Sequence, residues 1–460
     1  MYQIDFNKPV KVHFMGIGGI SMSGLAEILL DRGFTVSGSD VKPSAITKKL
    51  EAQGITVYYG QKASNITDDI HMIVYTAAIH PDNPEFAAGA SKGIPMMDRA
   101  ELLGQIMKNY QNSVAVAGTH GKTTTTSMMS HILLDADTDP TISVGGILKA
   151  IHGNYRIGRS ENFITEACEY TNSFLKFNPK IEVILNIEED HMDFFKDLDD
   201  IRHSFREFAH KLPKDGLLVI NGEIDHYNEI CDELPCPVVT YGLNGDYDYT
   251  AENIVLDDVA DASFDVLYHK EKIARFHLNV PGIHNVSNAL AVIAVARALN
   301  ISMEHIRRGL LAFEGTDRRF EYKGEFNGIT VIDDYAHHPT EITATLTAAK
   351  NYPHHTTWCV FQPHTYSRTK AFLNDFAKSL SLADKVILAD IFPAREEDPG
   401  DIHSRDIQEL ITAAGGEAYY FPTFEEIEDF LIKNCEHGDL LITMGAGDVV
   451  LIGEKLLGKN

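Results

Sequence analysis

The chain has 460 residues, 44% of them hydrophobic and 23% charged, so it is long enough for several globular domains. Its 66 acidic and 40 basic residues give a formal net charge of −26, which disfavours binding to nucleic acid or to an anionic membrane. The five scattered cysteines form no CxxC pair, so they predict neither a disulfide framework nor a zinc site.

No export signal is visible at the N-terminus, and the longest apolar stretch, at 289–299, is too short to span a membrane. We therefore expect a cytoplasmic protein that acts on neither nucleic acid nor membrane.

The first unit begins with a predicted strand at 10–15, a glycine turn, a helix at 22–30 and a strand at 34–37. A glycine turn before a helix holds a diphosphate, and an acidic residue about 20 positions later binds a sugar hydroxyl. Serine replaces the third glycine of the dinucleotide pattern, so three interpretations stay open. The turn could bind NAD, bind another nucleotide diphosphate, or have a purely structural role, and we favour the other nucleotide diphosphate. The candidate residues are Gly16, Gly18, Gly19, Ser21 and Asp40. Strands at 56–59 and 72–76 and a helix at 98–107 complete this unit.

The second unit begins at 113–126, SVAVAGTHGKTTTT, which predicts a buried strand, a tight turn and a helix from Lys122. Such a turn directs free N–H groups and the positive helix end at one point, which suits a phosphate. Lys122 adds charge for the outer phosphates, and the Thr123 hydroxyl can hold Mg²⁺. Val116 replaces the first glycine of the usual P-loop, so this loop is a shortened variant. The alternative is a strand-turn-helix junction that binds no ligand. The candidate residues are Gly118, Thr119, His120, Gly121, Lys122, Thr123 and Thr124.

Two later strands should end beside this loop. The strand at 163–165 runs into Glu166, and the strand at 181–186 leads to an acidic run that ends at His191. In an open parallel sheet, ligands bind at the carboxyl ends of the strands. The sequence therefore predicts one Mg²⁺ on Thr123 and Glu166 and a second on His191, the alternative being an ordinary turn histidine.

A helix predicted from the PGIHN segment to about residue 299 carries Asn285 and Asn288 on one face. Two interpretations stay open: the amides either cap the helix or contact a nucleotide beside the phosphate loop.

The third unit places polar groups, not glycine turns, at its strand ends. A charged loop at 315–321 precedes a strand at 330–332 that ends in DDYAHHP, and a strand at 358–361 leads into QPHTYSR. Two more buried strands are predicted at 386–389 and 440–443. Alternating strands and helices predict another doubly wound sheet.

These units predict an α/β protein with three domains, at residues 1–109, 110–314 and 315–460. A triphosphate site, a diphosphate-type site and a third unit with arginines and histidines at its strand ends together indicate a ligase that uses ATP to join two substrates. A carboxylate must be activated before it condenses with an amine, and transfer of the γ-phosphate makes an acyl phosphate. Lys122, an arginine and Mg²⁺ would offset the repulsion between the two anions.

The motifs GTHGKTTTT, TEACEYTNSF, EEDHMD, PGIHNVSNA, DRRFE and DDYAHHPTE resemble, in this order, those of the Mur ligase family. The resemblance covers nearly the whole chain. It implies a Rossmann-like UDP-binding domain, a central P-loop ATPase-like domain and a C-terminal Rossmann-like domain. It also implies a monomer or homodimer that uses ATP and Mg²⁺ to join L-alanine to the lactyl carboxylate of UDP-N-acetylmuramate, in peptidoglycan precursor synthesis.

The resemblance further implies roles for individual residues. The catalytic residues would be Lys122, His191, Arg319 and Asp334. ATP would be contacted by the phosphate loop together with Asn285, Asn288 and Arg319. The glycine turn and Asp40 would bind the UDP moiety, and the incoming amino acid and acyl group would face His337, His338 and Arg368. Thr365 stands where the family pattern leads us to expect a second arginine.

Because Arg319 must reach a phosphate on the central domain, we expect the third domain to close over ATP. Three alternative functions stay open: a recycling ligase that attaches a murein tripeptide to the same sugar nucleotide, a nicotinamide-dependent oxidoreductase, and a non-catalytic module gated by a nucleotide.

Overall fold

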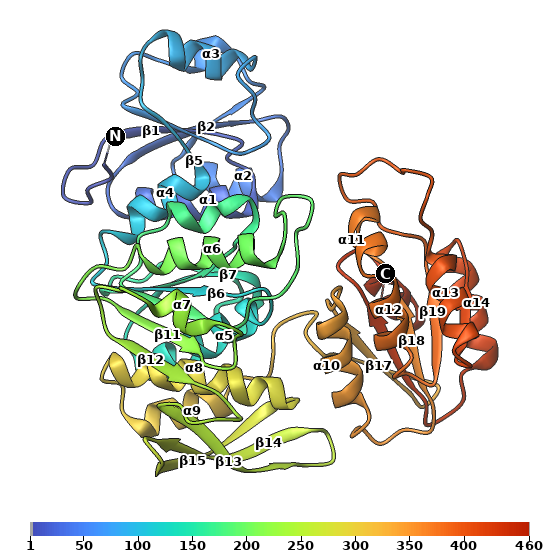
Figure 1. The fold of residues 1–460 in the computed structure, drawn as a ribbon. Helices are drawn as coiled ribbons and strands as arrows, with labels where there is room; N and C mark the ends of the chain where they lie inside the picture. Colours follow the sequence, from blue (N-terminus) through green and yellow to red (C-terminus); the bar gives the residue numbers. More distant parts are fainter. Residues whose placement is uncertain (1–2, 460) are drawn as a thin grey trace.

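The computed structural model describes residues 3–459 and is an α/β protein whose named strands form three sheets (Figure 1). The first sheet is parallel throughout, with strand order β3-β2-β1-β4-β5. The predicted helix at 98–107 begins one residue later, because Asp98 ends β5 and its Oδ1 accepts the N–H of Glu101 at 2.9 Å. The elements are β1 (Lys11–Met15), α1 (Ile20–Asp31), β2 (Thr35–Asp40), α2 (Ala45–Ala52), β3 (Thr56–Tyr59), β4 (Met72–Tyr75), α3 (Pro84–Ser91), β5 (Met96–Asp98) and α4 (Arg99–Met107).

The second sheet has the order β15-β14-β13-β12-β11-β10-β6-β9-β7-β8. Its central strand β6 is fully buried over Val114–Ala117 and pairs in parallel with β10 and β9, as the apolar run predicts. The elements are β6 (Asn112–Ala117), α5 (Lys122–Asp135), β7 (Thr141–Leu148), β8 (Gly153–Arg156), β9 (Asn162–Ala167), β10 (Ile181–Ile184), α6 (Leu198–Ala209), β11 (Leu217–Asn221), α7 (Tyr227–Cys231), β12 (Val238–Tyr241), β13 (Tyr249–Leu256), β14 (Asp261–Tyr268), β15 (Glu271–Pro281), α8 (Ile283–Ala298) and α9 (Met303–Leu311).

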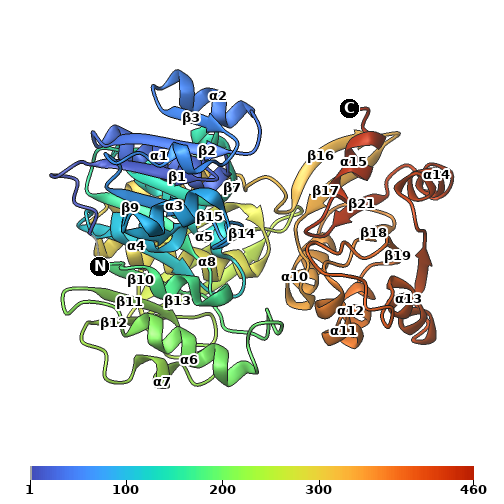
Figure 2. The same cartoon turned by 90° about the horizontal axis from the view of Figure 1, so that it is seen from above.

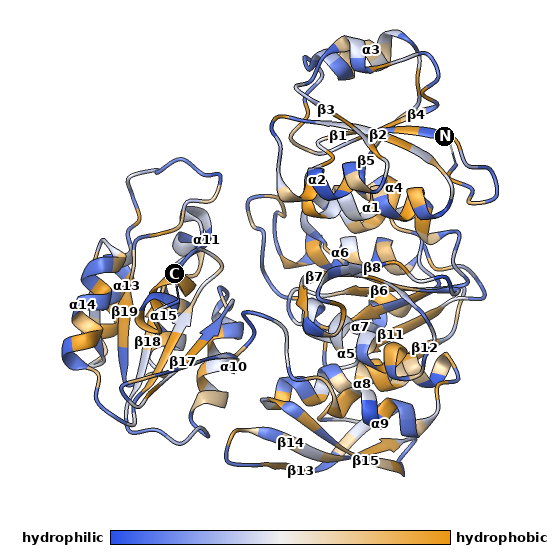
Figure 3. Ribbon diagram, turned by 180° about the vertical axis from the view of Figure 1, so that it is seen from behind, coloured by the Kyte–Doolittle hydropathy of each residue, from blue (hydrophilic) through white to orange (hydrophobic). Residues whose placement is uncertain are grey.

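The third sheet has the order β16-β17-β21-β18-β19-β20, with only the β16–β17 pair antiparallel. Its elements are β16 (Glu321–Phe326), β17 (Ile329–Asp334), α10 (Pro339–Ala349), β18 (Thr357–Phe361), α11 (Tyr366–Ala371), α12 (Leu373–Leu380), β19 (Lys385–Leu388), α13 (Ser404–Ala413), β20 (Glu417–Tyr420), α14 (Phe424–Asn434), β21 (Leu440–Met444) and α15 (Val450–Leu456). Hydrophobic residues lie on strands of the sheets and on parts of the helices (Figure 3).

The first two sheets are joined by an apolar core, whereas the third has cores of its own. Leu103 and Ile106 of α4 belong to the same buried cluster as Phe205 and Phe208 of α6. Two separate clusters cover the two faces of the third sheet. In Figures 1 and 2 the third unit accordingly lies beside a column formed by the first two. Within residues 3–459, no helix has the length and apolarity to cross a bilayer.

Glu182 lies on β10 inside the second sheet, fully buried, and neither carboxyl oxygen has a hydrogen-bond partner among the described residues. Burial raises its pKa well above the ordinary value, opposed weakly by Lys211. When an acid has a higher pKa in the folded than in the unfolded protein, the free energy of unfolding falls as pH rises above the unfolded-state pKa of about 4.3. The reason is that the carboxyl group then ionises readily only in the unfolded chain.

We therefore expect Glu182→Gln to stabilise the protein relative to the wild type by an amount that grows with pH from about 4.5 upward. The slope is at most about 1.4 kcal/mol per pH unit. Urea unfolding at several pH values measures this difference, with exposed Glu271→Gln as the matched control. Parallel stability curves for the wild type and Glu182→Gln would contradict it.

Candidate functional site

The predicted phosphate loop connects β6 to α5 and is fixed by the end of β10. Gly118 and Gly121 have φ values of +145° and +81°, which favour glycine. The backbone N–H of Thr119 donates to the Asn186 carbonyl at 3.2 Å, and that of His120 donates to Asn186 Oδ1 at 2.7 Å. Gly121 is the N-cap of α5, so the loop presents the N-terminus of this helix to an anion.

Lys122 lies inside this loop and pairs with a carboxylate that sequence reasoning missed. Its Nζ donates to the carbonyls of Gly118 and Thr119 and to Glu169 Oε2 at 3.2 Å. Burial opposes its charge, but the Glu169 carboxylate outweighs this effect and raises the pKa of Lys122. The side chain is therefore a fixed cation at neutral pH. The only sequence signal for Glu169 is its place in the TEACEY stretch, shortly after Glu166.

The predicted metal ligands Thr123 and Glu166 both lie against the glycines of β7. Glu166 Oε1 accepts the N–H of Gly145, and a Cβ added to Gly146 would lie 3.2 Å from Thr123 Cγ2. A hydroxyl and a carboxylate are ligands that Mg²⁺ accepts. Glu169 Oε1 is buried without a hydrogen-bond partner in the described part of the chain, which leaves an oxygen available to a cation nearby.

His191 lies on the other side of Glu169. Its Nε2 is 3.9 Å from Glu169 Oε1 and 3.7 Å from Asp190 Oδ2, and its ring packs on Tyr170 with centroids 4.5 Å apart. Burial lowers the pKa of His191, although Asp190 and Glu169 oppose this shift. The structure thus places a neutral imidazole beside the pair formed by Lys122 and Glu169.

A cavity of about 280 Å³ joins the phosphate loop to the asparagine pair and to the third sheet. Asn288 Nδ2 donates to Asn285 Oδ1 at 3.1 Å, and Asn285 Nδ2 donates to the Pro281 carbonyl at 2.8 Å. The N-cap of α8 is Gly282, so the interpretation of the two asparagines as caps is wrong. Both amides instead line the cavity with His120, Gly121, Thr124, Arg319 and Asp334.

Arg319 and Asp334 form the far wall of this cavity. Arg319 Nη1 is 3.7 Å from Glu341 Oε1. The Asp334 carboxylate accepts the N–H groups of Phe320 at 2.8 Å and Ala336 at 2.7 Å. Because Phe320 follows Arg319, the bond to Phe320 orders the loop that carries Arg319. Burial raises the pKa of Asp334 to about 6.

His337 lies in the loop between β17 and α10. Its backbone N–H donates to Glu341 Oε2 at 3.1 Å, and its ring Nδ1 lies 2.9 Å from the Tyr335 carbonyl. Burial lowers its pKa to about 4, which keeps the ring neutral.

His338 and Arg368 contact the central unit through polar atoms. His338 Nε2 lies 3.0 Å from the Glu189 carbonyl, and Arg368 Nη2 lies 2.8 Å from Asp190 Oδ1. Arg368 and His191 line a cavity of about 480 Å³ between the two units. Thr365, in the place of the expected second arginine, is the N-cap of α11 and has a φ of +67°.

In the first sheet, Asp40 accepts a hydrogen bond from the glycine turn predicted to bind a diphosphate. Gly16 has a φ of +80°, Gly18 N–H donates to Asp40 Oδ2 at 2.8 Å, and Gly19 is the N-cap of α1. A Cβ at Gly18 would lie 2.6 Å from Asp40 Oδ2. Ser21 Oγ accepts from Arg99 at 3.2 Å.

A cavity of about 810 Å³ extends from α1, next to this turn, to Thr123 and Arg319. All three units contribute to its lining. The predicted diphosphate residues Gly16, Gly18, Gly19, Ser21 and Asp40 are not part of that lining.

Comparison with protein families matches three consecutive parts of the chain. Residues 11–111 match the Mur ligase family, catalytic domain; residues 116–296 match the Mur ligase middle domain; and residues 318–447 match the Mur ligase, glutamate ligase domain.

Individual relatives are similar over the full length. A UDP-N-acetylmuramate–L-alanine ligase of Agathobacter rectalis is 63% identical over 459 residues, covering 100% of both chains. Among solved structures, a UDP-N-acetylmuramate-alanine ligase of Thermotoga maritima is 30% identical, with a TM-score of 0.77 over 98% of both chains. A murein peptide ligase of Psychrobacter arcticus is 25% identical, with a TM-score of 0.67 over 98% of both chains.

Proposed function

The chain belongs to the Mur ligase family, and from this premise we propose that it joins L-alanine to the lactyl carboxylate of UDP-N-acetylmuramate at the expense of ATP. The observation that carries the proposal is the convergence of the Lys122 loop, the asparagine pair and Arg319 on one cavity, in a chain 63% identical to a ligase of that name. The reaction belongs to peptidoglycan precursor synthesis in the cytoplasm, where both nucleotides are made.

The proposed chemistry has two steps. The lactyl carboxylate oxygen attacks the γ-phosphorus of ATP, which releases ADP and leaves an acyl phosphate. The neutral amine of L-alanine then attacks the acyl carbon, and the tetrahedral intermediate collapses to the amide, phosphate and a proton. Lys122 and Arg319 hold the phosphates against the approaching carboxylate, so their positive charges offset the repulsion between two anions.

We assign Mg²⁺ to Thr123 and Glu166, with His191 for a second ion. Bound there, Mg²⁺ would neutralise phosphate charge in the transition state. The glycine turn (Gly16, Gly18, Gly19 and Ser21) and Asp40 are proposed for the UDP moiety. His337, His338 and Arg368 are proposed for the amino-acid and acyl side, and Asp334 orders the Arg319 loop.

We also propose domains at 1–109, 110–314 and 315–460, and a monomer or homodimer. One sheet in each proposed range and the three consecutive family matches support these divisions.

The alternatives are not favoured by the comparisons. The 63% identical relative is named for L-alanine and not for a tripeptide. Residues 11–111 of the first unit match a Mur ligase family domain, which disfavours a nicotinamide oxidoreductase.

The test is amino-acid-dependent ADP formation in the presence of UDP-N-acetylmuramate. We expect L-alanine to support turnover and the murein tripeptide to support little. Preference for the tripeptide would replace the proposal with the recycling ligase, and a melting temperature raised by NADH but not by the UDP-sugar would favour the oxidoreductase.

Nucleotide binding is expected to draw the third unit closer to the second. This unit contacts the second through polar pairs such as Arg368–Asp190 and shares no apolar core cluster with it among the described residues, so the interface can rearrange at low cost. Small-angle scattering with a non-hydrolysable ATP analogue should show a smaller radius of gyration. An unchanged radius would count against closure.

A further inference from the structure

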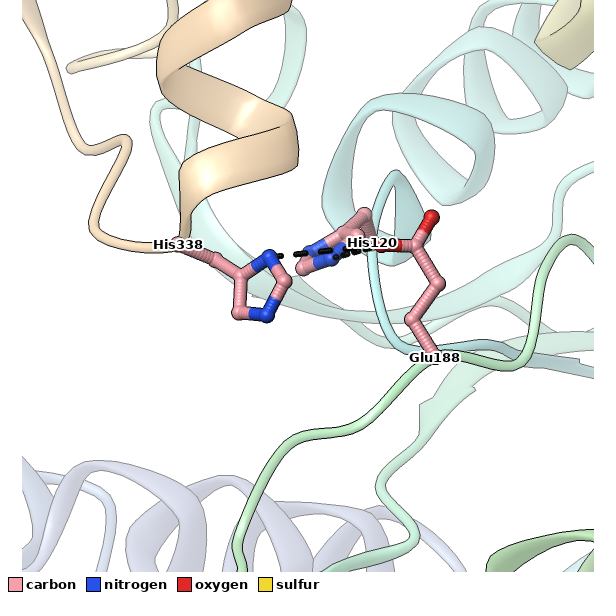
Figure 4. Close-up of side chains that lie close together, drawn as sticks. All are labelled: His120, Glu188 and His338. Carbon is pink, nitrogen blue, oxygen red and sulfur yellow. Dashed lines mark ion pairs between the residues drawn. The ribbon is translucent and has the colours of Figure 1, made fainter. Parts of the chain in front are cut away.

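Two histidines and a glutamate from two units of the protein meet beside the phosphate loop (Figure 4). His120 belongs to the loop before α5, Glu188 follows β10, and His338 is the N-cap of α10. One ligand atom from each residue lies within 4.8 Å of the other two. None of these three side chains has a place in the Mg²⁺ site proposed above, although His338 is also proposed for the amino-acid and acyl side.

His120 is oriented as a metal-binding histidine would be. Its Nδ1 lies 3.2 Å from Glu341 Oε1, so this nitrogen can donate its proton to a carboxylate. Its Nε2 is buried, lies 3.5 Å from Glu188 Oε2 and has no hydrogen-bond partner within residues 3–459. Histidines that bind metals usually donate the other ring N–H to a carboxylate or a backbone carbonyl, which fixes the ring.

His338 and Glu188 have the same kind of support. His338 Nε2 lies 3.0 Å from the Glu189 carbonyl. Its Nδ1 lies 4.0 Å from Glu188 Oε2 and accepts the backbone N–H of Thr340 at 3.3 Å, a capping bond that a bound metal would replace. Glu188 Oε2 also accepts the Thr340 hydroxyl at 2.5 Å. All three candidate ligands are thus oriented by a second group.

We propose that His120, Glu188 and His338 form a binding site for Zn²⁺, distinct from the Mg²⁺ site of the ligase. Two imidazoles and one carboxylate are a common zinc ligand set, with water in the fourth position, whereas Mg²⁺ prefers oxygen ligands alone. The Glu188 and Glu341 carboxylates supply the negative charge that a dication needs in a buried place.

Binding exchanges a proton for the metal. Burial opposes the charge on His120, but Glu341 and Glu188 outweigh it and raise its pKa to about 9 without metal. Zn²⁺ therefore takes the Nε2 lone pair and one proton leaves to solvent.

The bound ion would join the phosphate loop to α10 and so hold the third unit against the second. Because Arg319 and the loop must rearrange around ATP, we expect Zn²⁺ at this site to inhibit the ligase.

The test measures metal binding on the full-length, metal-free protein without nucleotide, so its outcome does not depend on ligase activity. Co²⁺ is titrated as a spectroscopic probe of the site and then displaced by Zn²⁺. His338→Asn keeps a residue that caps helices well but replaces the imidazole ligand with an amide. We expect His338→Asn and Glu188→Gln each to weaken Zn²⁺ binding at least about tenfold.

Two controls separate this site from others. His277→Ala disrupts the Asp257–Asp261–His277 cluster, and Glu166→Gln disrupts the proposed Mg²⁺ site; neither should change the tight Zn²⁺ affinity. Circular dichroism checks that each variant is folded. Unchanged affinity in both His338→Asn and Glu188→Gln, loss of the tight site in either control, or displacement of Co²⁺ by millimolar Mg²⁺ would overturn the proposal.

Discussion

Replacing Lys122 with alanine is expected to lower the rate of ADP formation at least about a hundredfold, equivalent to about 3 kcal/mol of transition-state stabilisation. Lys122 is the buried cation of the phosphate loop, and Glu169 neutralises it at 3.2 Å in the absence of ATP. Without it, negative charge developing between the γ-phosphate and the attacking carboxylate is left unbalanced. Steady-state kinetics at saturating substrates measure the loss in kcat.

The matched control is Lys180→Ala, which removes a lysine of the same unit that pairs with Asp215 near the surface. Its rate should stay close to that of the wild type. Because Lys122→Ala also leaves Glu169 without its ion-pair partner, the melting temperature is recorded to show that the variant is folded at the assay temperature. A folded Lys122→Ala protein with normal turnover would favour the non-catalytic, nucleotide-gated module.

The second large effect is expected from substitution of two adjacent arginines, one of which should affect turnover and the other stability. Arg319 lines the cavity opposite the phosphate loop, with Glu341 as its ion-pair partner at 3.7 Å. Arg319→Ala should reduce kcat roughly a hundredfold or more, as expected when a cation that stabilises transferring phosphate is lost, while the melting temperature changes little.

The Arg318 side chain instead makes structural contacts within the third unit. It pairs with Asp333 at 3.0 Å and donates to the carbonyls of Gly445 and Gly447, so it connects β17 to the loop after β21. Arg318→Ala should lower the melting temperature, because Asp333 would remain buried without its charged partner. If Arg318→Ala proved more damaging to turnover than to stability, and Arg319→Ala the reverse, the assignment of the two arginines would be wrong.

Local patterns predicted the parts of the fold nearest the proposed chemistry. The strand at 114–117, the glycine turn and the helix from Lys122 occur where expected, because buried β-branched residues, left-handed glycines and a helix start are adjacent in sequence. The strands β13 and β14 are not among the elements that local patterns predict. Their pairing shifts register between Glu252 and Val255, and such a bulge breaks the two-residue alternation that identifies a strand.

Contacts between distant segments could not be predicted. Glu169 was overlooked because its pairing with Lys122 depends on how β9 and β6 end beside each other. His120 and His338 come from separate units, yet their rings lie 4.6 Å apart. Asp40 was expected to face a sugar, but it bonds the turn that precedes it, and its role toward the UDP moiety stays a prediction.

If ATP activates the lactyl carboxylate as an acyl phosphate, oxygen-18 placed in that carboxylate will follow the phosphate. Enzyme, ATP, L-alanine and labelled UDP-N-acetylmuramate are allowed to react, and the released phosphate is examined by mass spectrometry. We expect a labelled oxygen in the inorganic phosphate, because the bond that breaks in the second step joins the acyl carbon to that oxygen. Unlabelled phosphate together with complete amide product would contradict it.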